Sequence, residues 1–418
     1  MNWLLRDANT LRVVLARAIS RTGGEAAFFV GIWGKAAYEL DASPGEQALL
    51  MGTMGISALA GSALAGVMVD RSDPRRVVML SELFFVPSTL ALALPNTIGQ
   101  MTLVIVLAAV CGGAVLTSVA SMPPFLTDDP DRLHRINAAV DAGASFAFML
   151  GPALGAIIVR YASIDWIFVL DAATSVVAVA LVVGVALRTR PERAERRSTF
   201  TEMRAGFGYA FTHRALRLYI GVFIGLWLSF GAFAALEPLF YRDVLRVGPE
   251  ALGWVNTIFG VGILGGSILL GRLPARGLTA RAAIVGALGS GLGAVIYTGT
   301  DRLTVVVIGA VYWGIVLGAM FPMVRTLIQR ATPDALMGRV VGTTDVSSQV
   351  GELLPLTFVP ALAALWGIQP VLVGSGVCVI VLGIAAWGEA GAVDRLPREP
   401  REVEPEFRLA DEPLTPTP

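Results

Sequence analysis

The sequence predicts an all-α membrane protein whose twelve transmembrane helices form two pseudo-symmetric six-helix bundles. Of its 418 residues, 55% are hydrophobic and only 15% are charged, and the mean hydropathy is +0.69. A soluble protein carries about 25% charged residues, so lipid is the expected solvent for much of this surface. Long apolar runs recur along the chain, and the connections between them alternate in charge.

Twelve apolar segments approach the length of about 20 residues that a helix needs to cross the hydrocarbon core. They cover residues 12–36, 48–69, 76–95, 101–123, 137–160, 163–187, 216–240, 250–271, 280–299, 302–324, 340–366 and 368–388. The segments form an N-terminal bundle over residues 1–187 and a C-terminal bundle over residues 216–388.

The connection over residues 188–215 and the end of the chain are expected to lie outside the membrane. Within the connection, residues 200–211 alternate apolar and polar groups with a helical period, which predicts a helix at the membrane interface. The alternative is that this stretch extends the seventh span. Residues 389–418 mix Pro, Glu, Asp and Arg without a hydrophobic period, which predicts a disordered tail.

Arginine is concentrated in alternate connections. Nineteen arginines lie in the connections at residues 71–76, 132–135, 188–217, 272–281 and 325–339. The other side has only Arg160, Arg242, Arg246 and Arg302. Because cytoplasmic loops carry the excess of Lys and Arg, both termini and the tail are predicted to be cytoplasmic. The near-absence of lysine, with Lys35 alone, suggests a GC-rich bacterial genome and hence the cytoplasmic membrane of a bacterium.

The two halves carry a repeated pattern. Arg135 is followed by Asp141 after six residues and by Pro152 after eleven more; Arg339 is followed by Asp345 after six and by Pro355 after ten. Two six-helix repeats of this kind form a transporter architecture with a site at their interface. The matching positions of Arg135–Asp141 and Arg339–Asp345 predict gate pairs near the cytoplasmic face.

Charged side chains inside spans are costly and therefore informative. We expect three carboxylates to couple proton movement: Glu25, Glu237 and Glu352. Glu352 lies deep in its span with no basic residue nearby on its own helix, and a buried carboxylate without a partner favours the protonated form.

Two of these carboxylates leave alternatives open. Glu25 follows Arg21 by one helical turn, so the two residues form either a permanent pair or a pair that changes during transport. Glu237 either binds a cation or proton, or pairs with Arg242 at the rim. Asp171 is expected to lie nearer the surface and to be more easily solvated.

A loop signature and a glycine motif give the family resemblance. The loop between the second and third spans resembles the signature G-x-x-x-D-R-x-G-R-[RK] of the major facilitator superfamily, with Asp73 at the position of the loop glycine. Its matching residues are Gly66, Asp70, Arg71, Arg75 and Arg76. The form D-R-x-D-x-R-R is similar to the branch of macrolide-type and siderophore-type exporters. Residues 137–155 resemble the fifth-helix motif of the antiporters, although Ala156 stands where that motif has a glycine. The matching residues are Gly143, Gly151, Pro152 and Gly155.

The resemblance implies the major facilitator fold and proton-coupled efflux of a drug-like or amphiphilic small molecule by alternating access. It also implies a cytoplasmic gate in which Asp70 meets the start of the eleventh span. The loop arginines can pair with Asp128, Asp129 or Asp131. Cavity residues are expected among Arg21, Phe29, Trp33, Trp227, Trp313 and Met320, with packing as the alternative for most of them. An importer or uniporter of a nutrient, or a non-transporting receptor or scaffold, are the other functions considered.

Other chemistries have no signal in the sequence. The chain has no G-x-x-x-x-G-K-[ST] loop for ATP and no nucleophile-plus-base arrangement, so an enzyme is not expected. Cys111 and Cys378 have no metal-ligand or redox spacing, and neither a metal nor a cofactor is predicted. The expected partners are membrane lipids, a small-molecule substrate and protons, with no nucleic acid, and a monomer is expected.

Overall fold

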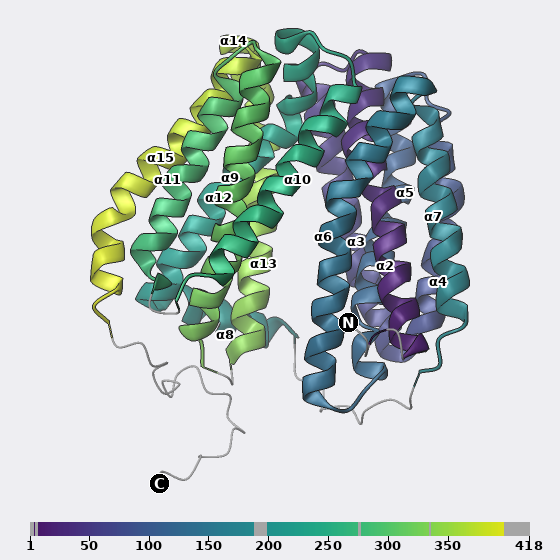
Figure 1. Cartoon of the computed structure of the whole chain (residues 1–418), viewed down its shortest axis with the longest axis horizontal. Coiled ribbons are helices and arrows are strands. Elements are labelled where there is room, and N and C mark those ends of the chain that lie inside the picture. The colour runs from purple at the N-terminus through teal and green to yellow at the C-terminus, as the bar shows by residue number, and fades with distance from the viewer. Residues whose placement is uncertain (1–3, 5–6, 188–198, 275–276, 334–335, 397–418) are drawn as a thin grey trace.

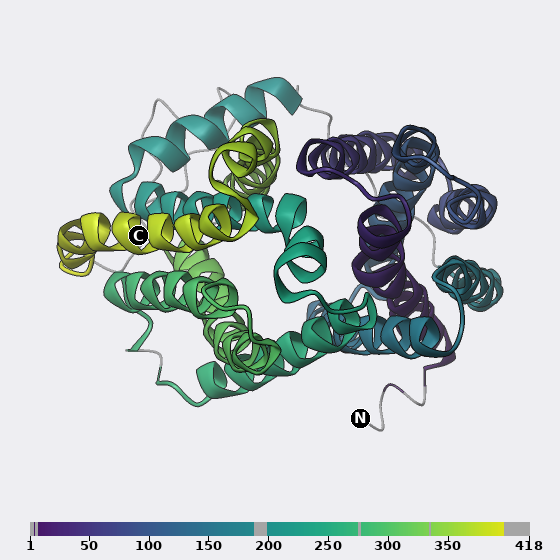
Figure 2. The same ribbon diagram turned by 90° about the horizontal axis from the view of Figure 1, so that it is seen from above.

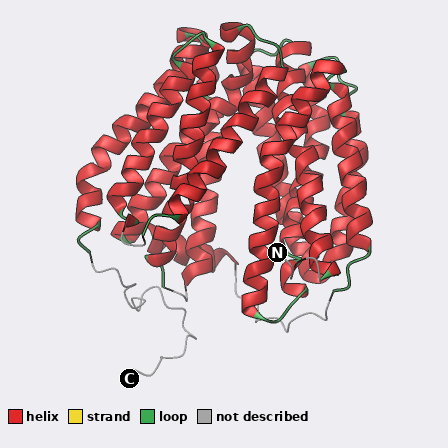
Figure 3. Cartoon of the chain, in the orientation of Figure 1, coloured by secondary structure: helices red, strands yellow, loops and turns green. Residues whose placement is uncertain are grey.

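The computed structural model describes Leu4 and residues 7–187, 199–274, 277–333 and 336–396, without the side chains of residues 199–205. Within these ranges every regular element is a helix (Figure 3). The helices stand in two groups side by side, one from each half of the sequence (Figure 1). The predicted linker residues 188–198 and most of the predicted tail, residues 397–418, lie outside the described residues.

The N-terminal bundle consists of six spans. They are α2 (Ala8–Ala26) continued by the π-helical segments η1 (Ala27–Ile32) and η2 (Lys35–Glu39), α3 (Pro44–Arg71), α4 (Pro74–Ala91), α5 (Ile98–Ala120) followed by the short turn η3 (Pro123–Phe125), α6 (Pro130–Tyr161) and α7 (Asp165–Val183). Side-chain caps fix several starts: Ser43 forms a capping box with Glu46 before α3, and Asp73 and Asp129 cap α4 and α6.

The C-terminal bundle repeats this arrangement. It consists of α9 (Arg214–Leu239) with the π-helical η4 (Phe240–Leu245), α10 (Glu250–Gly271), α11 (Ala280–Thr298), α12 (Leu303–Arg330), α13 (Met337–Leu353) with η7 (Leu354–Thr357) and α14 (Val359–Trp366), and α15 (Ile368–Val393). The span made by α13 and α14 is bent by 40°. Pro355 and Pro360 flank the break, and each removes a backbone donor from the helix.

Each of the twelve predicted segments falls on one of these spans. In the described part of the chain, nine helices have the length and composition of a membrane span, and the bent pair α13–α14 is a tenth. The remaining two, α2 and α4, are short helices of 19 and 18 residues that carry three or more charges each. Arg12, Arg17, Arg21 and Glu25 lie on α2, whereas Arg75, Arg76 and Glu82 lie on α4. The predicted all-α membrane fold is confirmed, while the domain boundaries, apart from the start of the tail, stay predictions.

The stretch after the linker forms a separate helix, α8 (Thr199–Thr212), so the alternative that it extends the seventh span is wrong. The extended backbone of His213, with ψ of 119°, separates α8 from α9. Figures 1 and 2 show α8 lying across the ends of the spans rather than parallel to them. Gly206 lets α8 approach α13 closely, because a Cβ there would lie 2.7 Å from the carbonyl oxygen of Arg339.

The start of the predicted tail at residue 389 is wrong, because α15 continues to Val393. Glu389 stays on the helix and accepts hydrogen bonds from Arg214 at 2.6 and 2.7 Å. This pair joins the end of the last span to the start of α9. The sequence showed no hydrophobic period here because the residues after Trp387 are small or charged.

The two bundles share a hydrophobic core at only one end. We call the end with the connections at residues 71–76, 132–135, 272–281 and 325–339 the arginine-rich face, and the other end the opposite face. One cluster of buried residues joins both bundles toward the opposite face, including Val30, Trp33 and Ala36 from one half and Leu236, Tyr241 and Leu252 from the other. Toward the arginine-rich face, each bundle has a separate cluster. The described conformation is therefore closed at the opposite face.

Exposed polar side chains mark the arginine-rich half of two spans. On α6 they are Asn137, Asp141 and Ser145, and on α13 they are Asp345 and Gln349. Such groups are costly against lipid, and in membrane proteins they face the bundle interior or a water-filled cavity. Together with the separate cores, these polar faces indicate a water-filled opening between the bundles at the arginine-rich face.

The loop before α4 should show a small acid sensitivity. Asp73 accepts hydrogen bonds from the backbone and side chain of Arg75, at 2.9 and 2.8 Å, and the side-chain bond holds the pKa of Asp73 below its usual value of 3.8. Folding lowers the pKa of Asp73. The stabilisation is therefore complete at pH values above the ordinary pKa of 3.8, and it is lost as the pH falls through the lower pKa of the folded protein. We expect Asp73→Asn to lower the melting temperature at pH 7 by the equivalent of less than about 1 kcal/mol, since the pair is partly exposed. The difference should shrink in thermal unfolding as the pH falls below 3.8; a difference that stays constant as the pH falls would contradict this role.

Candidate functional site

The first span carries a charged pair at its centre. Arg21 and Glu25 form an ion pair with an Nε–Oε1 distance of 2.5 Å, and the Glu25 side chain is 7% exposed whereas that of Arg21 is 38% exposed. Arg17, one turn earlier, lies within electrostatic range of Glu25 and Asp141. The structure therefore places the buried carboxylate of Glu25 beside the partly exposed guanidinium of Arg21. This arrangement fits both a permanent pair and a pair that changes during transport.

The glycines of the antiporter-type motif bring α6 against the first span. Added Cβ atoms would lie 3.2 Å from Ala18 at Gly143, 2.6 Å from the Cβ of Glu25 at Gly151, and 2.8 Å from Val30 at Gly155. The motif therefore sets the distance between α6 and the helix that carries Glu25.

The same motif also reaches the other bundle. A Cβ at Gly253 of α10 would lie 2.3 Å from the carbonyl oxygen of Pro152 and 2.7 Å from the Cβ of Ala156. Ala156 thus occupies the motif's missing glycine position, and the close approach at this point is made possible by Gly253 instead. Pro152 and Gly253 mark a tight contact between the bundles.

Gly151→Ala should destabilise the protein. Its Cβ would lie 2.6 Å from Glu25 and 3.0 Å from the backbone nitrogen of Ala26, and overpacking of this kind costs about 1–3 kcal/mol. Gly221→Ala is the matched control, because nothing lies within 4 Å of a Cβ there and alanine favours a helix by about 0.5–1 kcal/mol over glycine. Thermal unfolding should show a lower melting temperature for Gly151→Ala and an unchanged or higher one for Gly221→Ala. A Gly151→Ala protein as stable as the wild type would show that this contact is not tight.

Glu237 lies in the shared core and does not pair with Arg242. Its carboxylate accepts a hydrogen bond of 2.5 Å from the hydroxyl of Tyr297, which is 2.6 Å from the hydroxyl of Tyr241. Arg242 instead binds Asp41 and the carbonyl oxygens of Ala37 and Ala42 in the other bundle. The rim pairing offered as an alternative for Glu237 is therefore wrong in the described conformation.

Glu352 lies where the two bundles begin to touch. Its neighbour Leu353 contacts Gly55 of α3, with 2.8 Å between the leucine and an added Cβ, and Leu356 approaches Gly52 in the same way at 3.6 Å. The Glu352 side chain is half-buried, and the described residues offer it no hydrogen-bond or ion-pair partner. A partly buried carboxylate at the inner end of the opening can exchange a proton with water.

The predicted cavity aromatics separate into packing residues and accessible ones. Trp33 and Trp313 are buried, and their indole nitrogens donate to Met51 and Ser290 at 3.3 and 2.8 Å. Met320 is completely buried in the core of the C-terminal bundle, so its predicted place in the cavity wall is wrong here. Packing, the other interpretation, describes these three residues.

Phe29 and Trp227 stay cavity candidates. Phe29 is half-buried and makes edge contacts with Trp33 and Phe148. Trp227 is half-buried, stacks near Phe321 with 6.1 Å between ring centroids, and has an indole nitrogen without a hydrogen-bond partner in the described part of the protein. The indole nitrogen itself is buried, so the partly exposed ring faces, rather than the N–H, are suited to contact a ligand with an apolar body.

The loop predicted to form the gate has open space beside its glycine. Asp70 is exposed, and nothing lies within 4 Å of an added Cβ at Gly66 or at Gly338 and Gly342 on the eleventh span. Arg75 binds Asp73 and the carbonyl oxygen of Val185 in this conformation, and its pairing with acidic residues at 128–131, expected when the gate is closed, stays a prediction. The predicted meeting of Asp70 with the start of the eleventh span belongs to the closed gate and stays a prediction, as do the roles of Arg71 and Arg76.

The predicted gate pairs have other charged neighbours in this conformation. Asp141 lies within electrostatic range of Arg17, and Asp345 within that of Arg325. Arg339 lies below α8 and has one buried guanidinium nitrogen without a hydrogen bond. The pairing of Arg135 with Asp141 and of Arg339 with Asp345 stays a prediction for the closed gate.

Gly66→Leu tests that gate directly. In the described conformation the added side chain meets open space, so folding should be unaffected, whereas a gate that closes on this helix face would be blocked. We expect a loss of transport with unchanged substrate binding. Gly99→Leu, at another glycine with nothing within 4 Å, is the control and should transport normally. If Gly66→Leu and Gly99→Leu transport equally well, the loop does not act as a gate and its arginines only set the orientation of the protein in the membrane.

Sequence reasoning misplaced Asp171, which is 2% exposed rather than solvated. It accepts a hydrogen bond of 2.7 Å from Thr89 of α4, and Glu82 on the same helix is 1% exposed. The signal that could have found them is the polar spacing on both helices, Glu82 with Thr89 and Asp171 with Ser175. Each pair lies on one helical face and so predicts a polar interface between α4 and α7.

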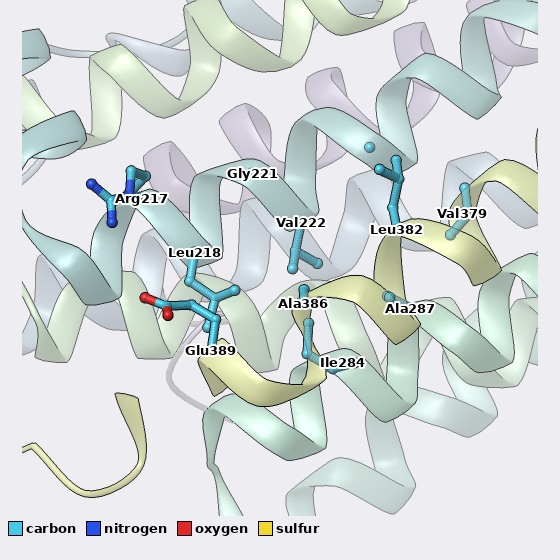
Figure 4. Close-up of a pocket in the computed structure, with 12 residues that line it drawn as sticks. Arg217, Leu218, Gly221, Val222, Ile284, Ala287, Val379, Leu382, Ala386 and Glu389 are labelled. Carbon is cyan, nitrogen blue, oxygen red and sulfur yellow. The ribbon is translucent and has the colours of Figure 1, made fainter. Parts of the chain in front are cut away.

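A lateral groove runs along the C-terminal bundle between α9, α11 and α15 (Figure 4). Its walls are apolar, with Arg217 and Glu389 at one end, and a neighbouring groove shares Gly225, Val379 and Leu382 with it and continues to α14. None of the predicted proton-coupling or cavity residues lines either groove. These grooves therefore belong to the outer surface of the bundle rather than to the site between the halves.

Comparisons with known proteins agree with this geometry. The Major Facilitator Superfamily profile matches residues 13–355. The multidrug efflux pump Tap of Mycobacterium tuberculosis (strain ATCC 25618 / H37Rv) is 24% identical, covering 83% of this chain and 85% of the pump. Tap of Mycolicibacterium fortuitum is 26% identical, covering 78% and 83%.

Solved structures share the fold at low identity. A POT family transporter in complex with 5-aminolevulinic acid has a TM-score of 0.74 at 12% identity, covering 92% of this chain and 96% of that one. A D-xylose-proton symporter has a TM-score of 0.70 at 13% identity, covering 90% and 97%. The helical architecture, the loop signature and the profile match agree: this chain is a membrane transporter that belongs to the Major Facilitator Superfamily.

Proposed function

We propose that this transporter exports a drug-like or amphiphilic small molecule in exchange for protons. The observation that carries the proposal is the placement of Glu25 and Glu352. One carboxylate lies on each bundle, near the level where the opening ends and the shared core begins. Protons moving down the membrane potential supply about 2.3 kcal/mol per charge per 100 mV, and carboxylates at this depth can carry them.

Alternating access is supported by the unequal contacts between the bundles at their two ends. The opposite face is closed by the shared core and by Arg242, and the arginine-rich face is open. By the positive-inside rule, the arginine-rich face is cytoplasmic, with both termini on that side of a bacterial cytoplasmic membrane. The described conformation is then the one that loads substrate from the cytoplasm, and rocking of the bundles about the central site would release it outside.

The substrate class is supported by the accessible aromatics and by the relatives. Phe29 and Trp227 offer partly exposed ring faces, which suit the apolar part of an amphiphile better than a highly hydroxylated nutrient. The two Tap proteins are named multidrug efflux pumps. Import is the second candidate, since the D-xylose-proton symporter shares the fold.

Everted membrane vesicles test the direction. With respiration acidifying the vesicle lumen, an exporter should take amphiphilic dyes into everted vesicles and release protons to the outside medium. A melting-temperature screen across dyes, macrolides and siderophores should first identify a ligand that stabilises the purified protein. Dye accumulation by right-side-out cells that depends on this protein would instead establish import.

A further inference from the structure

A second group of buried carboxyls lies inside the N-terminal bundle, away from the opening. Glu82 of α4 and Asp171 of α7 are 1% and 2% exposed, and one oxygen of each has no hydrogen-bond partner among the described residues. The hydroxyl of Ser175, one turn after Asp171, is also buried and lies close to the Glu82 carboxyl. We call these residues, with Ser20 and Thr89, the α4–α7 seam.

The seam is built by close packing of three helices. Ser20 of α2 donates to Glu82 at 3.1 Å, and Thr89 of α4 donates to Asp171 at 2.7 Å. Gly23 lets α2 approach the backbone of α7, since an added Cβ would lie 2.8 Å from the Cα of Asp171 and 2.0 Å from the hydroxyl of Thr174. No larger residue fits at Gly23 unless the seam opens.

The charges around the seam do not balance. The buried carboxyls of this bundle are Glu25, Glu82 and Asp171, and the guanidiniums beside them are Arg17 and Arg21. Arg21 is taken by Glu25 at 2.5 Å, and Arg17 is shared among Glu25, Glu82 and Asp141. The groups that act on Asp171 are the Thr89 hydroxyl and Glu82, and neither is cationic.

The other titratable groups on the packed helices lie elsewhere along them: Cys111 of α5 faces Ser88, Arg12 contacts Gly184 at the end of α7, and Lys35 pairs with Asp165 at its start. An isolated buried carboxylate is too costly to keep ionised, and it accepts a proton instead. A protonated carboxyl also gains an O–H donor, which the unpaired oxygens of the seam lack. The polar groups of the seam are therefore arranged to hold at least one proton.

We propose that the α4–α7 seam is a second proton-binding site, which exchanges its proton during transport and competes with Glu25 for Arg17. Loss of the proton from Glu82 draws Arg17 toward the seam and away from Glu25 and Asp141. Return of the proton frees Arg17 for the carboxyls at the opening. α2 carries Arg17, Ser20 and Gly23, so it connects the seam to the central site. This proposal rests on proton-coupled transport but assigns the proton to residues outside the central site.

Infrared difference spectra of the purified full chain between pH 5 and pH 9 test the seam without transport. The wild type should show the C=O band of a buried carboxyl that appears as the pH falls, and the double variant Glu82→Gln/Asp171→Asn should lose it. Asp301→Asn, at an exposed carboxylate, should keep it. Ser20→Ala, which removes one hydrogen-bond donor to Glu82 and leaves both carboxyls in place, should shift the pH midpoint of the band and serves if the double variant does not fold.

The outcomes separate the seam from the proposed function. A band that is unchanged in the double variant, or unmoved by Ser20→Ala, would overturn the seam as a proton site. Loss of the band on adding sodium at constant pH would also overturn it, in favour of a sodium site. If the band titrates as expected but transport does not depend on the proton gradient, the proposal of proton-coupled export is wrong, whereas the α4–α7 seam is still a proton-binding site.

Discussion

Replacing Glu25 or Glu352 by glutamine should abolish proton-driven efflux while leaving a folded protein that still binds its substrate. Glutamine has nearly the same shape but cannot exchange a proton. If each cycle moves one net charge, the lost driving force is about 2.3 kcal/mol per 100 mV, or about a 50-fold change in the concentration ratio that the transporter sustains. The substrate ratio across everted vesicles measures this directly.

The two variants should differ in their structural cost. Glu25→Gln leaves Arg21 without its ion-pair partner, so some loss of stability is expected, whereas Glu352 has no partner to lose in the described conformation. Glu352→Gln is therefore the cleaner test of coupling. Asp301→Asn, an exposed carboxylate on the opposite face, is the control and should sustain the wild-type ratio. If both glutamine variants sustain that ratio too, the coupling assignment is wrong.

Arg242→Ala should open the opposite face. Its guanidinium donates to Asp41 at 2.8 Å and to the carbonyl oxygens of Ala37 and Ala42 at 2.7 and 3.3 Å, all in the other bundle. Asp41 is 92% exposed, so the carbonyl contacts carry most of the effect. A hydrogen bond to a charged group contributes about 1.5–3 kcal/mol, so its loss should raise the population open at this face by about tenfold or more.

Labelling of a buried cysteine measures that population. Ala36 is completely buried in the shared core, so Ala36→Cys, in a protein with Cys111 and Cys378 replaced, should react slowly with a membrane-impermeant maleimide. Adding Arg242→Ala should accelerate the reaction. Arg302→Ala removes an exposed charge on the same face and should leave the rate unchanged. An unchanged rate with Arg242→Ala would mean that the shared core alone keeps this face closed.

The fold was predictable because each span satisfies a local rule. Length and hydropathy identify ten of the spans in the described part of the chain, and the arginine alternation makes α2 and α4 necessary despite their charges. The break in the eleventh span at Pro355 and the separate helix α8 depend on local backbone geometry. The break lies inside the predicted segment 340–366, which was expected to be continuous. For the stretch that forms α8, a separate helix was one of two alternatives, and extension of the seventh span was the other.

The site was predictable only where a residue's role depends on its own helix. Arg21 and Glu25 pair because they are one turn apart, and Gly151 packs tightly because the motif puts glycine on the face toward α2. Burial depends on which way a helix is rotated, and periodicity is weak in a span that is apolar all round. Met320 and Asp171 were misplaced for that reason.

Partners on the other bundle were beyond the sequence. Arg242 and Asp41 lie about half the chain apart, and nothing in their local patterns joins them. The state of the predicted gate would depend on the balance between two conformations of the same sequence, so the sequence predicts a gate at Asp70 without identifying its contact. Contacts between the two bundles are therefore known only from the structure.

The most direct test of proton-coupled export is transport by the purified protein in liposomes with an imposed pH gradient. Liposomes acidic inside, containing protein inserted with its arginine-rich face outward, should accumulate an amphiphilic dye such as ethidium and release protons at the same time. A protonophore should abolish both movements. Dye uptake that is unaffected by the gradient, or that proceeds in the same direction as the protons, would contradict the account.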